Sequence, residues 1–289
     1  MPGLRRGRYL ARFADGPRDL EAAGRLRGQA FFPADPMAAR AEARATALAA
    51  DPIDRDGLHV LIEECDTGAL ACCFRLLPLA SGAGIERSYS AQFYQLDSLR
   101  AYAGPMLEVG RFCVRRESKG ALAADPDPDI LRVAWAALTR FVDDHNVRML
   151  FGCSSFPGTA SEAYADAFAW LGARHLAPRQ WRPGIKAPRV IRFDTAAADG
   201  QAERSPVAPD RMRALGRMPP LLRTYLTMGG WVSDHAVVDQ RMNTLHVFTG
   251  VELSRIPPAR ARLLRADASQ TTGQTATHTA THTAGQPAE

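Results

Sequence analysis

Apolar residues follow two spacings along the chain, and the change from one to the other predicts the secondary structure. Continuous or alternating apolar runs, typical of strands, occupy residues 9–14, 59–64, 69–79, 105–114, 147–155 and 187–194. A period near 3.6, typical of amphipathic helices, covers residues 17–31, 36–50, 127–145, 159–175 and 219–229. The clearest stripe belongs to the helix at 127–145, where Ile130, Ala134, Leu138 and Phe141 share one face.

The order of these segments predicts the class of fold. The strands 59–64 and 69–79 flank a short turn and form a hairpin, and the second half of the chain alternates between strands and helices. Residues 89–99 form a helix or a loop, residues 235–253 hold one or two strands, and residues 257–266 form a short basic helix. This order predicts an α/β protein with a mixed sheet, in which one strand–helix–strand unit supplies a parallel pair.

Composition divides the chain into one domain, 1–265, and a tail, 266–289. The tail repeats Thr-His-Thr-Ala and lacks the residues that build a packed core, so we expect it to be disordered. Its histidines, His278 and His282, are expected to be solvated rather than to bind a metal ion.

The whole chain has the composition of a soluble globular protein. It has 289 residues, of which 46% are hydrophobic and 23% charged. No apolar run approaches the roughly 18 residues of a membrane-spanning helix, and the first residues do not resemble a secretory signal. Five cysteines, without a C-x-x-C pair, indicate free thiols in a reducing cytoplasm and no zinc site.

The distribution of charge is more informative than the net charge of +5. Only Lys119 and Lys186 are lysines, and the arginine bias reflects genome composition more than binding of nucleic acid, which we do not expect. Residues 51–110 carry nine acids and four bases, a balance of −5, whereas residues 201–265 carry ten bases and five acids, a balance of +5. This contrast suits a cationic small substrate and an anionic partner or surface.

Two motifs resemble catalytic signatures but lack a required residue. The segment 152–156, GCSSF, resembles the nucleophile turn of hydrolases, but Phe156 stands where the second glycine is needed. His235-x-x-x-Asp239 resembles an acyltransferase motif, but it lies in an alternating strand without the preceding histidine or following glycine, so we expect a structural role. No dinucleotide fingerprint, P-loop or H-E-x-x-H motif occurs.

The segment 107–114, LEVGRFCV, is the strongest candidate for chemistry. In a regular strand Glu108 and Arg111 would face opposite sides of the sheet. Gly110 between them suggests a β-bulge, which would turn both side chains into one cleft and free backbone N–H groups to polarise a carbonyl. The alternative is an ordinary buried strand in which the long Arg111 side chain reaches solvent.

Four segments together resemble the bacterial ornithine-lipid N-acyltransferases, which belong to the GNAT superfamily and are similar in fold to acyl-homoserine-lactone synthases. They are LEVGRFCV, YSAQFY at 89–94, FGCSSFPGT at 151–159 and LLRTYLTMGGWVSDHAVVD at 221–239. The resemblance covers residues 9–265. It implies a GNAT-like sheet with N-terminal hairpin strands, a central bulged strand, a parallel pair splayed around the acyl-donor site, and flanking helices.

The resemblance also implies a reaction, the transfer of a 3-hydroxyacyl chain from acyl carrier protein to the α-amine of L-ornithine, giving a lyso-ornithine lipid. Glu108 is the expected base, and Arg111 is expected to hold the substrate carboxylate or a structural acid. Backbone N–H groups near Phe112 and Cys113 would hold the thioester oxygen. Asp54 and Asp97 are the residues expected to bind the side-chain ammonium of ornithine. The acceptor pocket or the acyl tunnel is expected to be lined by Tyr89, Ser90 and Gln92.

The donor is expected to be a carrier protein because the loop after the bulged strand lacks the glycine-rich pyrophosphate motif of acetyl-CoA users. Carrier proteins are generally acidic, and a basic docking patch would comprise Arg115, Arg116, Lys119 and Arg132. No cofactor or metal is expected to be bound, since acyl carrier protein is a co-substrate.

Several alternatives remain at this point. The chain would also suit an acyl-homoserine-lactone synthase, an acyltransferase for another amino acid or for acyl-CoA, or a binding module without catalysis. Cys113 as a covalent acyl carrier is the alternative to direct attack. The basic segment 255–265 is expected either to rest on an anionic membrane, as a peripheral contact, or to cap the domain.

Overall fold

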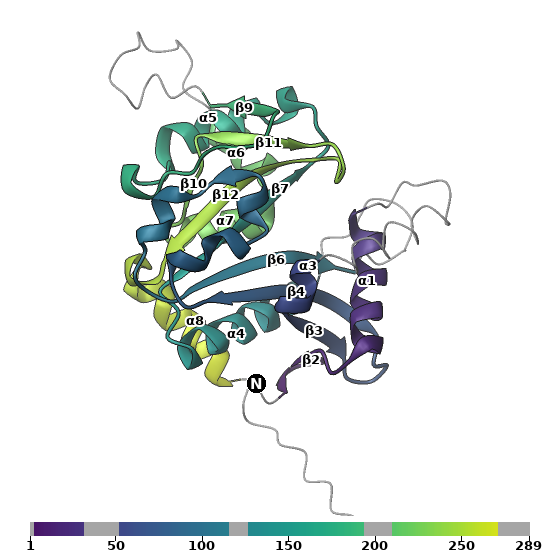
Figure 1. Ribbon diagram of the computed structural model, residues 1–289. Coiled ribbons are helices and arrows are strands. Elements are labelled where there is room, and N and C mark those ends of the chain that lie inside the picture. The colour runs from purple at the N-terminus through teal and green to yellow at the C-terminus, as the bar shows by residue number, and fades with distance from the viewer. Residues whose placement is uncertain (1–2, 32–51, 116–126, 194–209, 271–289) are drawn as a thin grey trace, which may run out of the picture.

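The computed structural model describes residues 3–31, 52–115, 127–193 and 210–270. Its main sheet has the order β1-β2-β3-β4-β6-β7-β12-β11-β9, with β10 paired to β12 (Figure 1). The N-terminal half consists of β1 (Leu4–Arg6), β2 (Tyr9–Phe13), β3 (Leu58–Glu64), β4 (Leu70–Leu79) and β6 (Met106–Val114). The C-terminal half consists of β7 (Met149–Pro157), β9 (Val190–Arg192), β10 (Trp231–Val232), β11 (His235–Asp239) and β12 (Thr244–Glu252).

The two halves meet at a fork between β6 and β7. These strands run parallel and pair only from Met106 with Met149 to Glu108 with Phe151. Beyond this point β6 continues beside β4 and β7 beside β12, so the sheet opens. Gly152 follows the last pair, and a Cβ atom there would lie 2.3 Å from the carbonyl oxygen of Val109. A side chain at this position would therefore push the strands apart at the vertex of the fork.

Helices and loops cover both faces of the sheet. The helices are α1 (Pro17–Phe31), α3 (Pro52–Asp56), α4 (Pro128–Asp144), α5 (Ala165–Arg174), α6 (Arg211–Arg217), α7 (Pro220–Thr227) and α8 (Pro258–Gln270). One face packs against α4 through Leu107, Val109 and Leu150. The other carries Glu108, Phe151 and Cys153 beneath the loop that holds Tyr94 and Leu96. Glu108 therefore lies on the face opposite α4.

The loop over Glu108 is built from short elements. Residues 82–101 contain three 3₁₀ helices, namely Gly82–Arg87, Ser90–Gln92 and Asp97–Ala101. Strand β5 (Tyr94–Gln95) lies between the last two and pairs with β8 (Gly184–Ile185) in a small second sheet. This pairing and the burial of Leu99 fix the position of the loop above β6.

The mixed α/β fold and its bulged, splayed strands confirm the predicted class, and most predicted elements lie within two residues of their expected bounds. Some expectations need correction. The predicted strand 187–194 is reduced to Val190–Arg192, strand β1 was missed, and the helix at 159–175 begins with a separate 3₁₀ turn, Ser161–Tyr164. Helix α8 continues to Gln270, past the predicted domain boundary at 265. The predicted helix 36–50 lies outside the described residues.

Candidate active site

A β-bulge interrupts β6 next to the fork. Cys73 on β4 faces Cys113, whereas Arg75, two residues further, faces Gly110, three residues back. The predicted bulge is therefore present. Its left-handed residue is Arg111, with φ of 55°, rather than Gly110. This conformation costs a non-glycine residue roughly 1–2 kcal/mol, and such strain is typical of functional sites.

Glu108 is buried at the vertex of the fork and is held by donors of the loop above it. Its Oε2 atom accepts a hydrogen bond of 2.8 Å from the Tyr89 backbone N–H. Its Oε1 atom accepts one of 2.8 Å from the Ser90 N–H and one of 2.6 Å from the Ser90 hydroxyl. Only 2% of Glu108 is exposed. A carboxylate can accept about four hydrogen bonds, so one position remains for water or a substrate proton.

Arg111 reaches the same loop as Glu108. Its guanidinium carbon lies 4.6 Å from the centre of the Tyr89 ring, a cation–π contact. The ring of Tyr89 lies 5.1 Å from that of Phe93, which meets the His246 ring edge-on at 4.9 Å. The bulge thus brings Glu108 and Arg111 to one side of the sheet, and a row of aromatic rings extends from them to β12.

Two further polar side chains belong to this site, and sequence reasoning did not assign them to it. Cys153 Sγ lies 3.5 Å from the Ser90 hydroxyl oxygen, and burial raises the pKa of this thiol to about 12. Since the Ser90 hydrogen is used toward Glu108, the thiol is the donor in this contact. Burial lowers the pKa of His246 to about 4, so its imidazole is neutral. Within the described ranges its Nε2 atom has no hydrogen-bond partner.

Asp54, predicted at the acceptor side, lies in a separate buried cluster. Its carboxylate accepts hydrogen bonds from Arg27 at 2.9 Å and from Arg75 at 2.7 Å. His59 Nδ1 lies 2.8 Å from the Arg27 guanidinium, which can only donate, so Nε2 carries the proton toward the Asp54 carbonyl oxygen, 2.9 Å away. Two arginines therefore occupy the place where an ammonium group would need to bind.

The remaining predicted acceptor and oxyanion residues are spread over the sheet. Gln92 and Asp97 are exposed, and Asp97 pairs with Arg100. Phe112 stacks on Phe74 at 5.3 Å, on the α4 face. Cys113 is buried beside Cys73 and α1, and burial raises the pKa of its thiol well above the usual value. A thiol held protonated in this way is a poor nucleophile.

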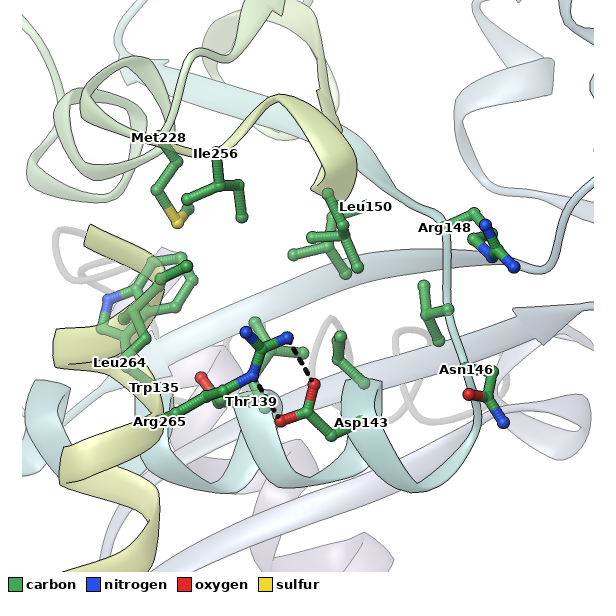
Figure 2. Close-up of a pocket in the computed structure, with 15 residues that line it drawn as sticks. Trp135, Thr139, Asp143, Asn146, Arg148, Leu150, Met228, Ile256, Leu264 and Arg265 are labelled. Carbon is green, nitrogen blue, oxygen red and sulfur yellow. Dashed lines mark hydrogen bonds and ion pairs between the residues drawn. The ribbon is translucent and has the colours of Figure 1, made fainter. Parts of the chain in front are cut away.

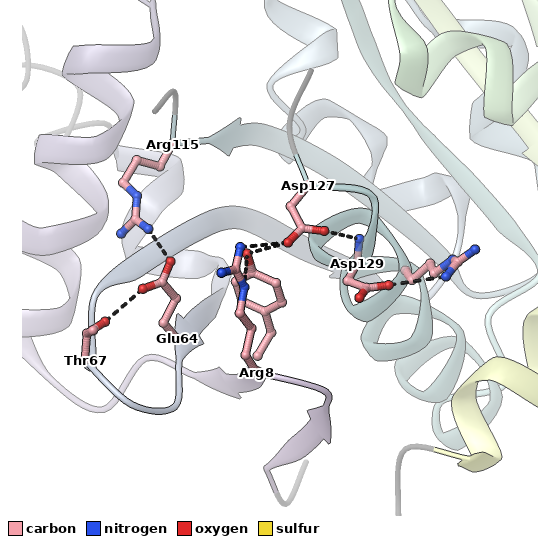
Figure 3. Close-up of polar contacts among 8 residues, drawn as sticks. Arg8, Glu64, Thr67, Arg115, Asp127 and Asp129 are labelled. Atoms are coloured by element: carbon pink, nitrogen blue, oxygen red, sulfur yellow. Dashed lines mark hydrogen bonds and ion pairs between the residues drawn. The ribbon is translucent and has the colours of Figure 1, made fainter. Parts of the chain in front are cut away.

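The predicted docking residues are partly paired within the chain (Figure 3). Arg115 bonds to Glu64 at 2.5 Å, and Arg132 bonds to Asp129 at 3.3 Å. Arg116 and Lys119 lie outside the described residues. Asp127 caps the N-terminus of α4 by accepting a hydrogen bond from the Asp129 N–H, and it also binds Arg8 and Tyr9. The N-terminal end of α4 is therefore occupied by a carboxylate of the chain itself.

The described part of the chain has neither a metal-binding cluster nor a membrane-spanning helix. No group of three or more His, Cys, Asp or Glu side chains there is arranged to hold a metal ion. None of the helices described has the length and apolar character needed to cross a membrane.

The fork and the bulged strand define an acyltransferase of the GNAT class. The family described as "Acetyltransferase (GNAT) domain" matches residues 26–125. The chain belongs to the L-ornithine Nα-acyltransferases. It is 34% identical to the member from Rhodobacter capsulatus, over 83% of this chain and 88% of that protein, and 26% identical to the member from Brucella abortus, over 91% of each.

Among solved structures, the chain is similar to an N-acyl amino acid synthase from uncultured soil microbes. The TM-score is 0.41 at 11% identity, with 88% of this chain and 96% of that chain covered. It is also similar to an acyl-homoserine-lactone synthase, with a TM-score of 0.34 at 14% identity and coverage of 85% and 90%.

Proposed function

We propose that this protein transfers a 3-hydroxyacyl chain from acyl carrier protein to the α-amine of L-ornithine and releases a lyso-ornithine lipid. The observation that carries the proposal is the buried Glu108, held by Tyr89 and Ser90 at the vertex of the fork. A transferase of this kind needs a proton acceptor where the amine meets the thioester. The names of the relatives support ornithine as the acceptor.

Glu108 removes the proton that the ammonium form of ornithine must lose before its nitrogen can attack. Because Glu108 is 2% exposed, a water molecule on its remaining acceptor position carries the proton. The nitrogen then forms a bond to the thioester carbon and the carbon–sulfur bond breaks. The phosphopantetheine sulfur leaves as a thiolate and becomes a thiol by taking up the second proton that the attacking nitrogen loses. Backbone N–H groups at the bulge, near Phe112 and Cys113, polarise the thioester oxygen.

Arg111 positions the amino-acid carboxylate. Its guanidinium is held over the Tyr89 ring, on the side of the sheet that carries Glu108. A planar guanidinium suits a carboxylate because it can donate two parallel hydrogen bonds. The proposed acceptor site does not include Asp54, since the carboxylate of this residue is already bound by Arg27 and Arg75.

The start of α4 does not offer the pyrophosphate site that a nucleotide donor such as acyl-CoA would need. Free helix N–H groups at this end would favour a phosphate, but the Asp127 carboxylate accepts a hydrogen bond from one of them, that of Asp129, and the Asp129 carboxylate adds a second negative charge. A nucleotide diphosphate would be repelled there, whereas phosphopantetheine brings a single phosphate diester.

Mass spectrometry of the reaction products tests the acceptor and the donor together. The purified protein is incubated with L-ornithine and either 3-hydroxyacyl carrier protein or the corresponding acyl-CoA. We expect N-acylornithine from the carrier-protein donor and much less from acyl-CoA. Equal yields from the two donors, or a preference for lysine, glycine or glutamine, would contradict the proposal.

Charge reversal tests the docking of the carrier protein. The double variant Arg115→Glu, Arg116→Glu is expected to raise KM for acyl carrier protein about tenfold and to leave KM for a short acyl-pantetheine unchanged. The control is Arg223→Glu, which reverses an exposed arginine on α7. A second control, Glu64→Gln, breaks the ion pair of Arg115 without reversing its charge. Equal effects on both donors would exclude a docking role.

A further inference from the structure

A cavity lies beneath α8, away from the fork. Its volume is about 250 Å³, and it is enclosed by α4, the end of α7, the start of β7 and α8 (Figure 2). Most of its walls are apolar, and they include Trp135, Leu138, Val142, Leu150, Met228 and Leu264. Ligand pockets in proteins are concave and lined mainly by apolar side chains with a small number of polar groups. A space of this size between apolar side chains therefore indicates room for an apolar ligand.

The cavity is separated from the candidate active site by the sheet. Leu107 and Leu150 pair across β6 and β7 and belong to the core on the α4 side. Their neighbours Glu108 and Phe151 also pair, and they belong to the opposite face. The cavity thus lies behind the hydrogen-bonded end of the two strands, whereas the fork opens in the other direction.

An ion pair spans the opening of the cavity. Arg265 on α8 donates two hydrogen bonds of 3.1 Å to the Asp143 carboxylate on α4, and Figure 2 shows this bridge between the helices. Its two side chains are 62% and 42% exposed, and pairs in that setting contribute little stability. Arg265 can therefore exchange Asp143 for another anion, and the exposed Arg148 lies on the same rim.

We propose that this cavity binds one acyl chain of an anionic amphiphile, with the chain inside and a carboxylate or phosphate headgroup at Arg265. A methylene group is about as large as a water molecule, about 30 Å³, so 250 Å³ holds a segment of about eight carbons. Helix α8 suits an anionic lipid, because Arg260, Arg262 and Arg265 outnumber its one acid, Asp267, and Leu263 is 61% exposed.

Displacement of cis-parinarate, a fluorescent fatty carboxylate, tests the proposal without acyl donor or ornithine, so the result does not depend on the proposed function. Dodecanoate should displace the probe at least tenfold better than dodecanol or dodecylammonium. Anionic phosphatidylglycerol vesicles are compared with dodecanoate, and the better competitor identifies a phosphate or a carboxylate as the preferred headgroup. Failure of every anionic competitor, or equal displacement by dodecylammonium, would overturn the proposal.

Variants place the ligand in this cavity. Thr139→Phe and Ala261→Leu each add a larger side chain to the lining, from α4 and from α8, and should weaken parinarate binding at least tenfold. Arg265→Glu should weaken dodecanoate at least tenfold and change dodecanol less than twofold. Arg25→Glu makes the same charge change at an exposed position of α1, outside the lining, and should bind as the unmodified chain does. Unchanged binding in both filled variants would refute the site, provided that circular dichroism shows both folded.

Discussion

Two buried carboxylates on the same side of the sheet are held in opposite ways. Asp54, 7% exposed, lies between two guanidinium groups, those of Arg27 and Arg75. Glu108, 2% exposed, accepts hydrogen bonds only from neutral donors, two backbone N–H groups and a hydroxyl, and within the described residues it forms no ion pair.

Two buried histidines repeat this difference. Both ring nitrogens of His59 have partners within the Asp54 cluster. His246 belongs to the aromatic row that begins at Tyr89. Its Nδ1 atom has the Tyr94 hydroxyl as a partner, whereas its Nε2 atom has none in the described part of the chain. The Asp54 cluster thus ties α1, α3, β3 and β4 together, while the Glu108 site keeps polar atoms available for a ligand.

The comparison shows that burial alone does not distinguish a catalytic carboxylate from a structural one. A carboxylate between two fixed cations is compensated, and removing it leaves charges uncompensated in the core. A carboxylate held by neutral donors stays in position without a cation that would compete with a proton for its oxygen atoms. This difference supports a structural role for Asp54 and is the reason for the proposed role of Glu108 as the base.

The largest effect is expected from Glu108→Gln. The amide cannot take up a proton, so turnover should fall about 10²–10⁴-fold, the usual contribution of a general base. Assays of initial rate with acyl carrier protein and ornithine measure it. Glu64→Gln, the same change at the end of β3, serves as the control and should keep normal turnover. A folded Glu108→Gln variant with near-normal turnover would remove Glu108 from the mechanism.

Asp54→Asn should act on stability instead. Loss of this charge breaks the ion pairs of Asp54 with Arg27 and Arg75, and breaking a buried ion pair in this way costs about 3–5 kcal/mol. Urea denaturation measures the free energy of unfolding. Asp56→Asn on the same helix is the control, since its pair with Arg87 is exposed and should change stability by less than about 1 kcal/mol. Equal losses in the two variants would contradict the structural role of Asp54.

His246 should make stability fall in weak acid. Burial lowers its pKa from 6.5 to about 4 in the folded protein. Between these values the unfolded chain binds a proton that the folded protein does not, so stability is lost as pH falls from 7 toward 4. At about 1.4 kcal/mol per unit, the loss by pH 4.5 is about 3 kcal/mol. Urea denaturation at pH 7 and at pH 4.5 measures this loss. The His246→Gln variant should lose less stability between the two pH values than the unmodified protein, and an equal loss would show that His246 is not its cause.

The smallest stability effect is expected from Arg111→Gly. Glycine adopts a φ of 55° without strain, which gains about 1 kcal/mol. Loss of the cation–π contact with Tyr89 removes about 0.5–1 kcal/mol. The relief of strain and the lost contact act in opposite directions on stability, whereas KM for ornithine should rise at least tenfold if Arg111 binds its carboxylate.

Asn243→Gly provides the matched control for that variant. Asn243 has a φ of 50° in the turn between β11 and β12, away from the bulge. It should gain stability in thermal unfolding and leave KM for ornithine unchanged. A similar rise in KM in both variants would show that the effect of Arg111→Gly comes from the backbone rather than from the lost guanidinium.

Features set by neighbouring residues could be predicted from the sequence. Helix α1 has the predicted bounds 17–31, and α4 lies within one residue of them, because helical periodicity depends on side chains three and four positions apart. The placement of Glu108 and Arg111 on one side of the sheet by a bulge was also predictable, since both residues belong to one strand and the side to which each points depends on local spacing. Arg116, Lys119 and the segment 36–50 lie outside the described residues, so what was expected of them stays a prediction.

Contacts between distant segments were decided only by the tertiary structure. Asp54 meets Arg27 and Arg75, 27 and 21 positions away, and no periodicity relates such positions. Likewise Glu108 meets the N–H groups of residues 89 and 90, and Gly152 meets the carbonyl of Val109, because the loop and the fork are packed that way. The sequence therefore determined which residues could carry the chemistry, whereas packing decided which carboxylate is compensated by arginines and which remains available for a substrate.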